Sequence, residues 1–211
     1  MRLEHHGPAI YLASRSPRRR EILNQLGVRF EDLLMHEQHG ADVDETPHPG
    51  EAPRDYVLRV ARAKALLGWR QVASRQLTRL PVLAADTTVV LGDQILGKPD
   101  NAAHACHLLR TLSARTHEVM SAVAVACEER LETALSVSTV EFRQLDDAEI
   151  DVYVASGEPL DKAGAYAIQG EAAIFVRALT GSYSSIMGLP LIDTAELLRR
   201  FDVQSTWGAR D

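Results

Sequence analysis

The sequence predicts an α/β protein of one domain, built on a mixed β-sheet with helices packed around it. Strand-like and helix-like segments alternate along the chain and hairpins occupy its middle, which favours a sheet with both parallel and antiparallel pairs. The length of 211 residues fits one ordinary domain. The composition, 45% hydrophobic and 25% charged, is typical of a globular protein with a sizeable core.

The chain opens with a short apolar strand that leads directly into a helix. Ile10 to Ala13 is the apolar run, Ser16 can cap a helix that begins at Pro17, and Gly27 ends that helix. Arginines fill positions 18–20, where positive charge opposes the helix dipole. A phosphate bound by backbone N–H groups, hydroxyls and arginines would offset that cost. A solvated basic first turn is the alternative, and these residues alone leave both open.

Hydrophobic periodicity and turn residues locate the remaining elements. Helices are expected at Glu51 to Trp69, Asn101 to Leu112, Asp146 to Ala155 and Pro190 to Phe201, with Asn101 and Asp146 as the caps of the second and third. Strands are expected at Val28 to Met35, Pro81 to Ala85, Val119 to Cys127, Arg130 to Phe142 and Ala172 to Leu179, with a hairpin over Val89 to Leu96 that turns at Gly92-Asp93. His36 to Pro53 is polar and predicts a long loop, whose length suggests function or mobility.

Charge and cysteine content narrow the class of protein. The net charge of −6 disfavours a nucleic-acid partner. The two cysteines, Cys106 and Cys127, fit reduced thiols of the cytoplasm better than a disulfide framework. The longest nearly apolar run, Val119 to Cys127, is too short to span a membrane, and we expect no targeting segment. Residues 1–8 and 202–211 are expected to be flexible ends around a domain at 9–201.

Two carboxylates are candidates for chemistry. Asp86 directly follows the apolar strand, and a carboxylate at the carboxyl end of a strand in an α/β sheet can bind Mg²⁺ or take a proton from water. Its alternative is a structural aspartate that accepts loop N–H bonds. Glu45 lies in an acidic stretch of the long loop and could supply a second carboxylate to a metal, or simply be a solvated charge.

Three lysines on separate elements, Lys64, Lys98 and Lys162, could neutralise a triphosphate, although each alone would be interpreted as a solvated charge. Gln169 offers a donor and an acceptor that suit uracil or thymine, or it satisfies a turn. Thr87 could contact the base or ribose, or bridge strand and turn. The run Gly92 to Lys98 fits G-x-x-x-x-G-K, but the next residue is proline, so the hydroxyl that binds Mg²⁺ in a P-loop is absent.

Several of these segments together resemble the motifs of the Maf family of nucleoside triphosphate pyrophosphatases, over about residues 9 to 201. The matching segments are Ile10–Leu23, Arg62–Ala65, Ala85–Val90 with Gly97–Pro99, Gly157–Gly170, and Gly181–Tyr183 with Gly188–Pro190. The segment Gly157–Gly170 resembles the branch that acts on dTTP and UTP rather than on methylated GTP. Ala167 stands where that branch usually has glycine, and adds a methyl group near the implied base pocket.

The resemblance implies a long central mixed sheet with two lobes around a cleft, as in Maf and HAM1 proteins, and a cytoplasmic homodimer. It implies hydrolysis of dTTP and UTP, or of modified pyrimidine nucleotides, to the monophosphate and pyrophosphate. Asp86 would be the general base, and Glu45 with Asp86 would hold Mg²⁺ or Mn²⁺. The substrate would be bound by Ser14, Arg18, Arg19, Lys64, Thr87, Lys98, Lys162 and Gln169. The alternative is a nucleotide-binding regulator of cell division or septum formation without relevant turnover.

Overall fold

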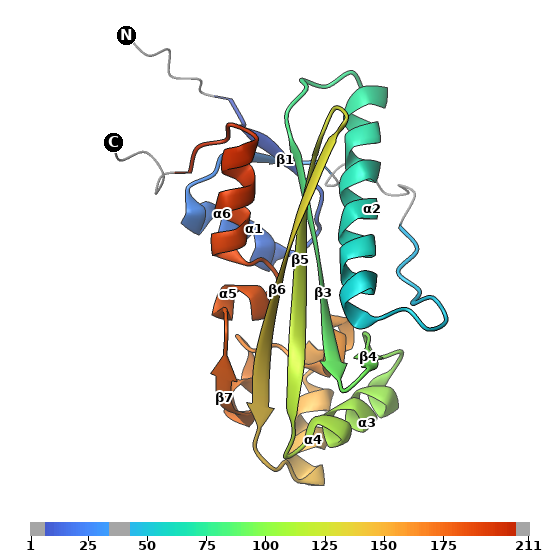
Figure 1. Ribbon diagram of the computed structural model, residues 1–211. Helices are drawn as coiled ribbons and strands as arrows, with labels where there is room; N and C mark the ends of the chain where they lie inside the picture. The colour runs from blue at the N-terminus through green and yellow to red at the C-terminus, as the bar shows by residue number, and fades with distance from the viewer. Residues whose placement is uncertain (1–6, 34–42, 206–211) are drawn as a thin grey trace.

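The computed structural model describes residues 7–33 and 43–205, and it contains one mixed seven-stranded sheet (Figure 1). The strand order is β2-β1-β3-β5-β6-β7, with β4 paired to β3 beside this path. Strand β1 pairs in parallel with β2 and β3, and all other pairs are antiparallel, which confirms the predicted mixed sheet. The strands are β1 Ile10–Leu12, β2 Phe30–Asp32, β3 Val82–Leu91, β4 Gln94–Leu96, β5 Thr116–Cys127, β6 Arg130–Phe142 and β7 Val176–Thr180.

Three of the predicted helix caps are confirmed. Helix α1 (Pro17–Leu26) begins after Ser16, whose hydroxyl accepts from the Arg19 backbone N–H, and ends at Gly27 in the left-handed conformation with φ 68°. Helices α3 (Ala102–Leu112) and α4 (Asp147–Ala155) are capped by the predicted Asn101 and Asp146, the latter within a capping box. The other helices are α2 Pro53–Ser74, α5 Tyr183–Ile186 and α6 Leu191–Arg200.

Several predicted boundaries were wrong. Strand β5 begins at Thr116 and not at Val119, because residues 116–118 also pair with β6. Helix α2 runs five residues past Trp69, because Val72 continues its buried face and no glycine or proline intervenes. Strand β7 begins at Val176 because the preceding Glu171–Phe175 forms a 3-10 helix. Strand β2 ends at Asp32, while positions 34 and 35 of the predicted strand, and residues 36–42 of the predicted loop, lie outside the described residues.

The largest correction concerns β3. We predicted a strand that ends at Ala85 and a separate hairpin strand from Val89, but the structure has one continuous strand, Val82–Leu91. Residues 82–90 pair without a break with β5, so Asp86 lies opposite Ala122 in the middle of the sheet and not at a strand end. The β-branched Thr87 and Thr88 favour an extended strand, although their polarity suggests a turn.

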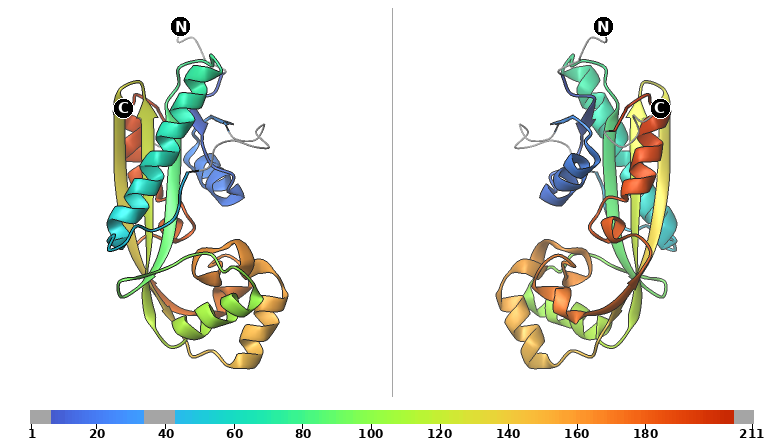
Figure 2. Two further views of the ribbon diagram at one scale, coloured as in Figure 1. Left: turned by 90° about the vertical axis from the view of Figure 1, so that its right-hand side faces the viewer. Right: turned by 90° about the vertical axis from the view of Figure 1, so that its left-hand side faces the viewer.

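The sheet carries two lobes, as expected (Figure 2). One lobe holds α1, α2 and α6 around the short parallel strands, and the other holds α3, α4 and the 3-10 turns between 158 and 175. Strands β3, β5 and β6 extend through both lobes. Helix α2 approaches β3 closely at Gly68, where a Cβ would lie only 2.8 Å from Cγ1 of Val82. This approach fixes the helix that carries Lys64 against the strand that carries Asp86.

The G-x-x-x-x-G-K run is part of the hairpin that the turn residues Gly92 and Asp93 predicted. Gly92 and Asp93 form the turn between β3 and β4, and Lys98 follows β4 in an extended loop before α3. A P-loop needs a strand, a phosphate-binding loop and then a helix. This segment therefore does not form one.

The proposed ends of the domain stay a prediction. Residues 1–6 and 206–211 lie outside the described residues. Val203, which follows α6, is 7% exposed and packs into the core, with its N–H bonded to the Leu198 carbonyl. Among the described residues, no helix combines the length and apolar character needed to cross a bilayer.

A buried histidine makes the stability of this fold depend on pH. His117 of β5 is 2% exposed, its Nε2 lies 2.8 Å from the hydroxyl of Tyr166, and its Nδ1 has no hydrogen-bond partner in the described part of the chain. Burial lowers the pKa of His117 from 6.5 to about 4. As the pH falls below 6.5, the unfolded chain therefore binds a proton at His117 that the folded chain does not accept until about pH 4.

We expect this histidine to cost about 2 kcal/mol of unfolding free energy at pH 5 relative to pH 7. Urea unfolding at both pH values checks this: the wild type should lose about 2 kcal/mol more than His117→Gln. His107→Gln, which removes an exposed histidine, serves as the matched control and should behave as the wild type does. Equal losses in the wild type and His117→Gln would contradict the prediction.

Candidate active site

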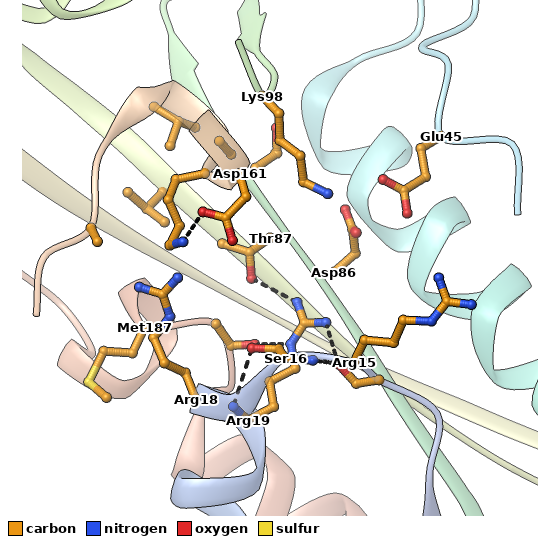
Figure 3. A pocket seen from close by; sticks show the side chains of 18 of the residues that line it. Arg15, Ser16, Arg18, Arg19, Glu45, Asp86, Thr87, Lys98, Asp161 and Met187 are labelled. Carbon is orange, nitrogen blue, oxygen red and sulfur yellow. Dashed lines mark hydrogen bonds and ion pairs between the residues drawn. The ribbon is translucent and has the colours of Figure 1, made fainter. Parts of the chain in front are cut away.

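A cleft of about 1200 Å³ lies between the two lobes (Figure 3). Its walls come from the start of α1, the middle of β3, helix α2, the loop after β4, the 158–170 segment and the end of α5. Every residue that we predicted for the site lines this cleft: Ser14, Arg18, Arg19, Glu45, Lys64, Asp86, Thr87, Lys98, Lys162 and Gln169. The topology therefore brings together side chains that are up to 155 positions apart, from 14 to 169.

The centre of the cleft holds two carboxylates joined by one lysine. The Nζ of Lys64 lies 2.7 Å from Oδ1 of Asp86 and 2.6 Å from Oε1 of Glu45. The side chain of Asp86 is 10% exposed and that of Glu45 is 45% exposed. Asp86 therefore lies buried against the sheet, and Glu45 lies on the open side of the cleft. Partial burial would raise the pKa of Glu45, but the hydrogen bond and charge of Lys64 outweigh it and hold that pKa below its usual range.

The donor set at this point suits a hard divalent cation. Glu45 and Asp86 supply two carboxylates, and Mg²⁺ is often bound by one or two carboxylates together with substrate phosphates. No cluster of three or more histidine, cysteine, aspartate or glutamate side chains with metal-binding geometry occurs in residues 7–33 and 43–205. Two carboxylates are as many protein ligands as such a shared Mg²⁺ site usually has, the rest coming from water and substrate phosphates.

Arg19 ties the start of α1 to the floor of the cleft. Its Nε donates to the Gly188 carbonyl at 2.9 Å, its Nη1 to Oγ of Ser14 at 3.2 Å and its Nη2 to Oγ1 of Thr87 at 3.4 Å. Burial lowers the pKa of Arg19, while the negative charges of Asp86 and Glu45 act in the opposite direction. Ser14 and Thr87, two predicted substrate contacts, are thus already engaged by a protein cation.

A short relay of hydroxyls continues from Thr87 into the core. Thr87 Oγ1 lies 2.7 Å from Oγ of Ser121, which donates to the Ser185 carbonyl at 2.6 Å. Because the hydroxyl proton of Ser121 is used there, Thr87 donates to Ser121 and accepts from Arg19. We did not predict Ser121 as a site residue, because the sequence does not show the partners of a serine inside an apolar strand. Gly188 was noted only as part of a matching motif, and its contact with Arg19 was not predicted.

Besides Lys64 and Arg19, four cations of the described residues line the cleft. Arg15 precedes α1, Arg18 lies in its first turn, exposed Lys98 follows β4, and Lys162 forms an ion pair with Asp161. Figure 3 shows Lys98 and Glu45 reaching toward Asp86, while Asp161 lies on the side of Arg18. Burial would raise the pKa of Asp161, but Lys162, and then Arg18, lower it. The cations therefore flank the carboxylate pair on two sides.

Gln169 projects from a turn that is anchored at both ends. The Gly170 N–H bonds to the Ala167 carbonyl at 3.0 Å, and Gln169 is exposed with no hydrogen bond to any other described residue. The Tyr153 hydroxyl accepts from the Ala167 N–H at 3.3 Å and donates to Glu158 at 2.9 Å, and Glu158 accepts from the Glu171 N–H at 3.2 Å. The amide is thus free to bind a ligand from a fixed backbone.

A sequence profile of the Maf-like protein family matches residues 9–201. The chain belongs to this family. It is 53% identical over 194 residues to a protein named dTTP/UTP pyrophosphatase from Nitrosomonas europaea, with 91% of this chain and 94% of that protein aligned. It is 55% identical over 195 residues to the protein of the same name from Aromatoleum aromaticum, with coverage of 91% and 95%.

Among solved structures, the Staphylococcus aureus Ham1 protein aligns with a TM-score of 0.46 and 14% sequence identity, over 91% of this chain and 96% of that chain. At this TM-score the likeness supports no conclusion about this Maf protein.

Proposed function

We propose that this Maf protein is a nucleoside triphosphate pyrophosphatase that hydrolyses dTTP and UTP, and related modified pyrimidine nucleotides, to the monophosphate and pyrophosphate. The observation that carries the proposal is the cluster of Asp86, Lys64 and Glu45 in a cleft flanked by cations. Relatives more than 50% identical over nine-tenths of the chain bear the name of that activity. Triphosphates carry several negative charges, and such a cleft neutralises them.

In the proposed reaction, water attacks the α-phosphorus of the nucleotide. Asp86 accepts the proton of the attacking water, a P–O bond forms, and the bond between the α-phosphorus and the α–β bridging oxygen breaks. Pyrophosphate leaves with that bridging oxygen. Arg18, Lys98 and Lys162 bind the phosphates, while Lys64 balances the charge of the two carboxylates and can contact a phosphate from the same position.

Arg19 has a double role in this scheme. It orients Ser14 and Thr87 through its hydrogen bonds, and its positive charge, which these neutral acceptors do not cancel, favours an anion beside them. Glu45 and Asp86 would hold Mg²⁺ or Mn²⁺, which when bound supplies further neutralisation of phosphate charge. Thr87 and Gln169 would contact the base or ribose.

The test is a nucleotide panel with product identification. The purified protein should release pyrophosphate, and no orthophosphate, from dTTP and UTP in the presence of Mg²⁺ or Mn²⁺. Binding of dTTP without any release of pyrophosphate would instead support a nucleotide-binding regulator of cell division or septum formation.

We also propose that the protein works as a cytoplasmic homodimer that binds neither nucleic acid nor membrane. The family resemblance supports the dimer, and the net charge of −6 disfavours a nucleic-acid partner. Light scattering after size-exclusion chromatography tests the dimer.

Arg18→Ala should weaken dTTP binding by about tenfold, because it removes a charge-assisted contact to phosphate. The loss should shrink as salt rises, since screening weakens the same contact in the wild type. Calorimetry with dTTP and with thymidine checks this, and Arg54→Ala, an exposed arginine of α2 outside the cleft, is the control. Equal losses for the triphosphate and the nucleoside would show that Arg18 does not bind phosphate.

A further inference from the structure

The segment that carries Glu45 has no regular structure of its own. Residues 43–52 contain neither helix nor strand, and Glu45 lies seven residues before Ala52, the N-cap of α2. A side chain on such a segment samples many positions unless other groups hold the backbone, because ordering each residue costs about 1–2 kcal/mol. Yet Glu45 reaches Lys64 at 2.6 Å, beside Asp86.

Two side chains of α2 hold three successive carbonyl groups of this segment. The hydroxyl of Tyr56 donates to the Glu45 carbonyl at 2.9 Å. Arg59 donates through Nη1 to the Asp44 carbonyl at 3.3 Å and through Nη2 to the Thr46 carbonyl at 3.0 Å. The backbone on both sides of Glu45, and Glu45 itself, is therefore bonded to a single helix.

A second contact of Arg59 closes the far end of the segment. Its Nε lies 2.6 Å from Oε1 of Glu51 and its Nη2 2.8 Å from Oε2, a two-point contact with a side chain that is 10% exposed. Glu51 also accepts from the His48 N–H at 3.0 Å. The hydrogen bond from Arg59 lowers the pKa of Glu51 to about 2, so this pair stays charged across the working pH range.

We infer that Tyr56 and Arg59 are positioning residues that hold the Glu45 carboxylate against Lys64 and Asp86. The inference deepens the proposed function and rests on it for the role of Glu45. Lys64 lies on the same helix, eight residues or about 12 Å along the axis from Tyr56. One helix thus carries both the residues that hold the segment, Tyr56 and Arg59, and the lysine that Glu45 contacts.

The first test compares Tyr56→Phe and Arg59→Lys with the wild type for dTTP hydrolysis. Tyr56→Phe keeps the ring and removes one hydrogen bond, so kcat/KM should fall about fivefold. Arg59→Lys keeps the positive charge but loses the planar guanidinium that makes several hydrogen bonds at once, so kcat/KM should fall about tenfold. Arg70→Lys, at an exposed position of α2 away from the cleft, is the matched control and should leave kcat/KM unchanged.

A double-mutant cycle separates positioning of Glu45 from a general structural effect. In a Glu45→Gln background, Tyr56→Phe and Arg59→Lys should each change kcat/KM by less than about twofold, because the group that they position is already lost. Full losses in that background would overturn the inference, as would wild-type rates in both single variants.

The second test needs no turnover and therefore separates this inference from the proposed function. NMR relaxation gives the backbone order parameter of Glu45, which reports how firmly the Tyr56 and Arg59 hydrogen bonds hold the segment. In Tyr56→Phe and Arg59→Lys this order parameter should fall from the rigid range of about 0.85 toward the flexible range below about 0.6, and in Arg70→Lys it should stay at the wild-type value. An unchanged order parameter of Glu45 in both Tyr56→Phe and Arg59→Lys would overturn the inference even if the protein hydrolyses dTTP. Absence of pyrophosphate release by the wild type would overturn only the proposed function.

Discussion

Asp86→Asn is expected to lower kcat for dTTP by about 10²–10⁴-fold, the usual range for loss of a general base. The amide keeps the size of the side chain but cannot accept a proton from water at neutral pH. Nucleotide binding should stay measurable by calorimetry, because Arg18, Lys98 and Lys162 remain in place. Pyrophosphate release under saturating dTTP is the measurement.

Two controls keep this result interpretable. Asp93→Asn makes the same chemical change at an exposed position in the β3–β4 turn, outside the cleft, and should turn over as the wild type does. Thermal unfolding of Asp86→Asn shows whether loss of the 2.7 Å ion pair with Lys64 has affected the fold. A folded variant with wild-type kcat would exclude Asp86 as the base.

The local structure of this protein was largely predictable where one short segment contains its own start and stop signals. The caps Ser16, Asn101 and Asp146 and the terminator Gly27 act within four residues of the groups that they bind. The antiparallel pair β5–β6 follows from alternation around a two-residue turn. Such features depend on neighbours in sequence, so sequence suffices for them.

The middle of β3 was not predictable in the same way. The polar run Asp86-Thr87-Thr88 interrupts an apolar pattern, and this interruption favours the interpretation as a turn. Pairing with β5 keeps this run in the strand, because residues 82–90 all pair with residues of β5. The chemistry that we assigned to Asp86 does not depend on this error, because a side chain in mid-strand still faces the cleft.

The contacts between the side chains of the site also depend on tertiary structure. We predicted Lys64 as a phosphate ligand, but the sequence could not show that α2 packs beside the middle of β3 and sets Lys64 between two carboxylates. Likewise Arg19 was expected to face substrate, whereas much of its hydrogen bonding goes to Ser14, Thr87 and Gly188. Residue types indicated the chemistry, and packing determined which groups meet.

Selectivity for the nucleobase of the substrate is expected to depend on Gln169. Its amide is exposed to the cleft from a turn that Tyr153 and Glu158 anchor. Gln169→Glu keeps the shape of the side chain and removes both donors at neutral pH, so a carbonyl of uracil or thymine would face a carboxylate. An unpaired or repelled polar group costs about 1–3 kcal/mol. The value of kcat/KM for dTTP and UTP should therefore fall by roughly 10–100-fold.

The added negative charge also opposes any triphosphate, so the informative quantity is the relative rate across dTTP, UTP, CTP, dATP and GTP. If Gln169 binds the nucleobase, kcat/KM must fall more for dTTP and UTP than for the other three nucleotides. Gln169→Met removes the donors without adding charge and should shift the ratios in the same direction. Gln144→Glu, at an exposed position outside the cleft, should leave the ratios unchanged. Relative rates that stay constant in both Gln169 variants would mean that this amide serves the turn and not the substrate.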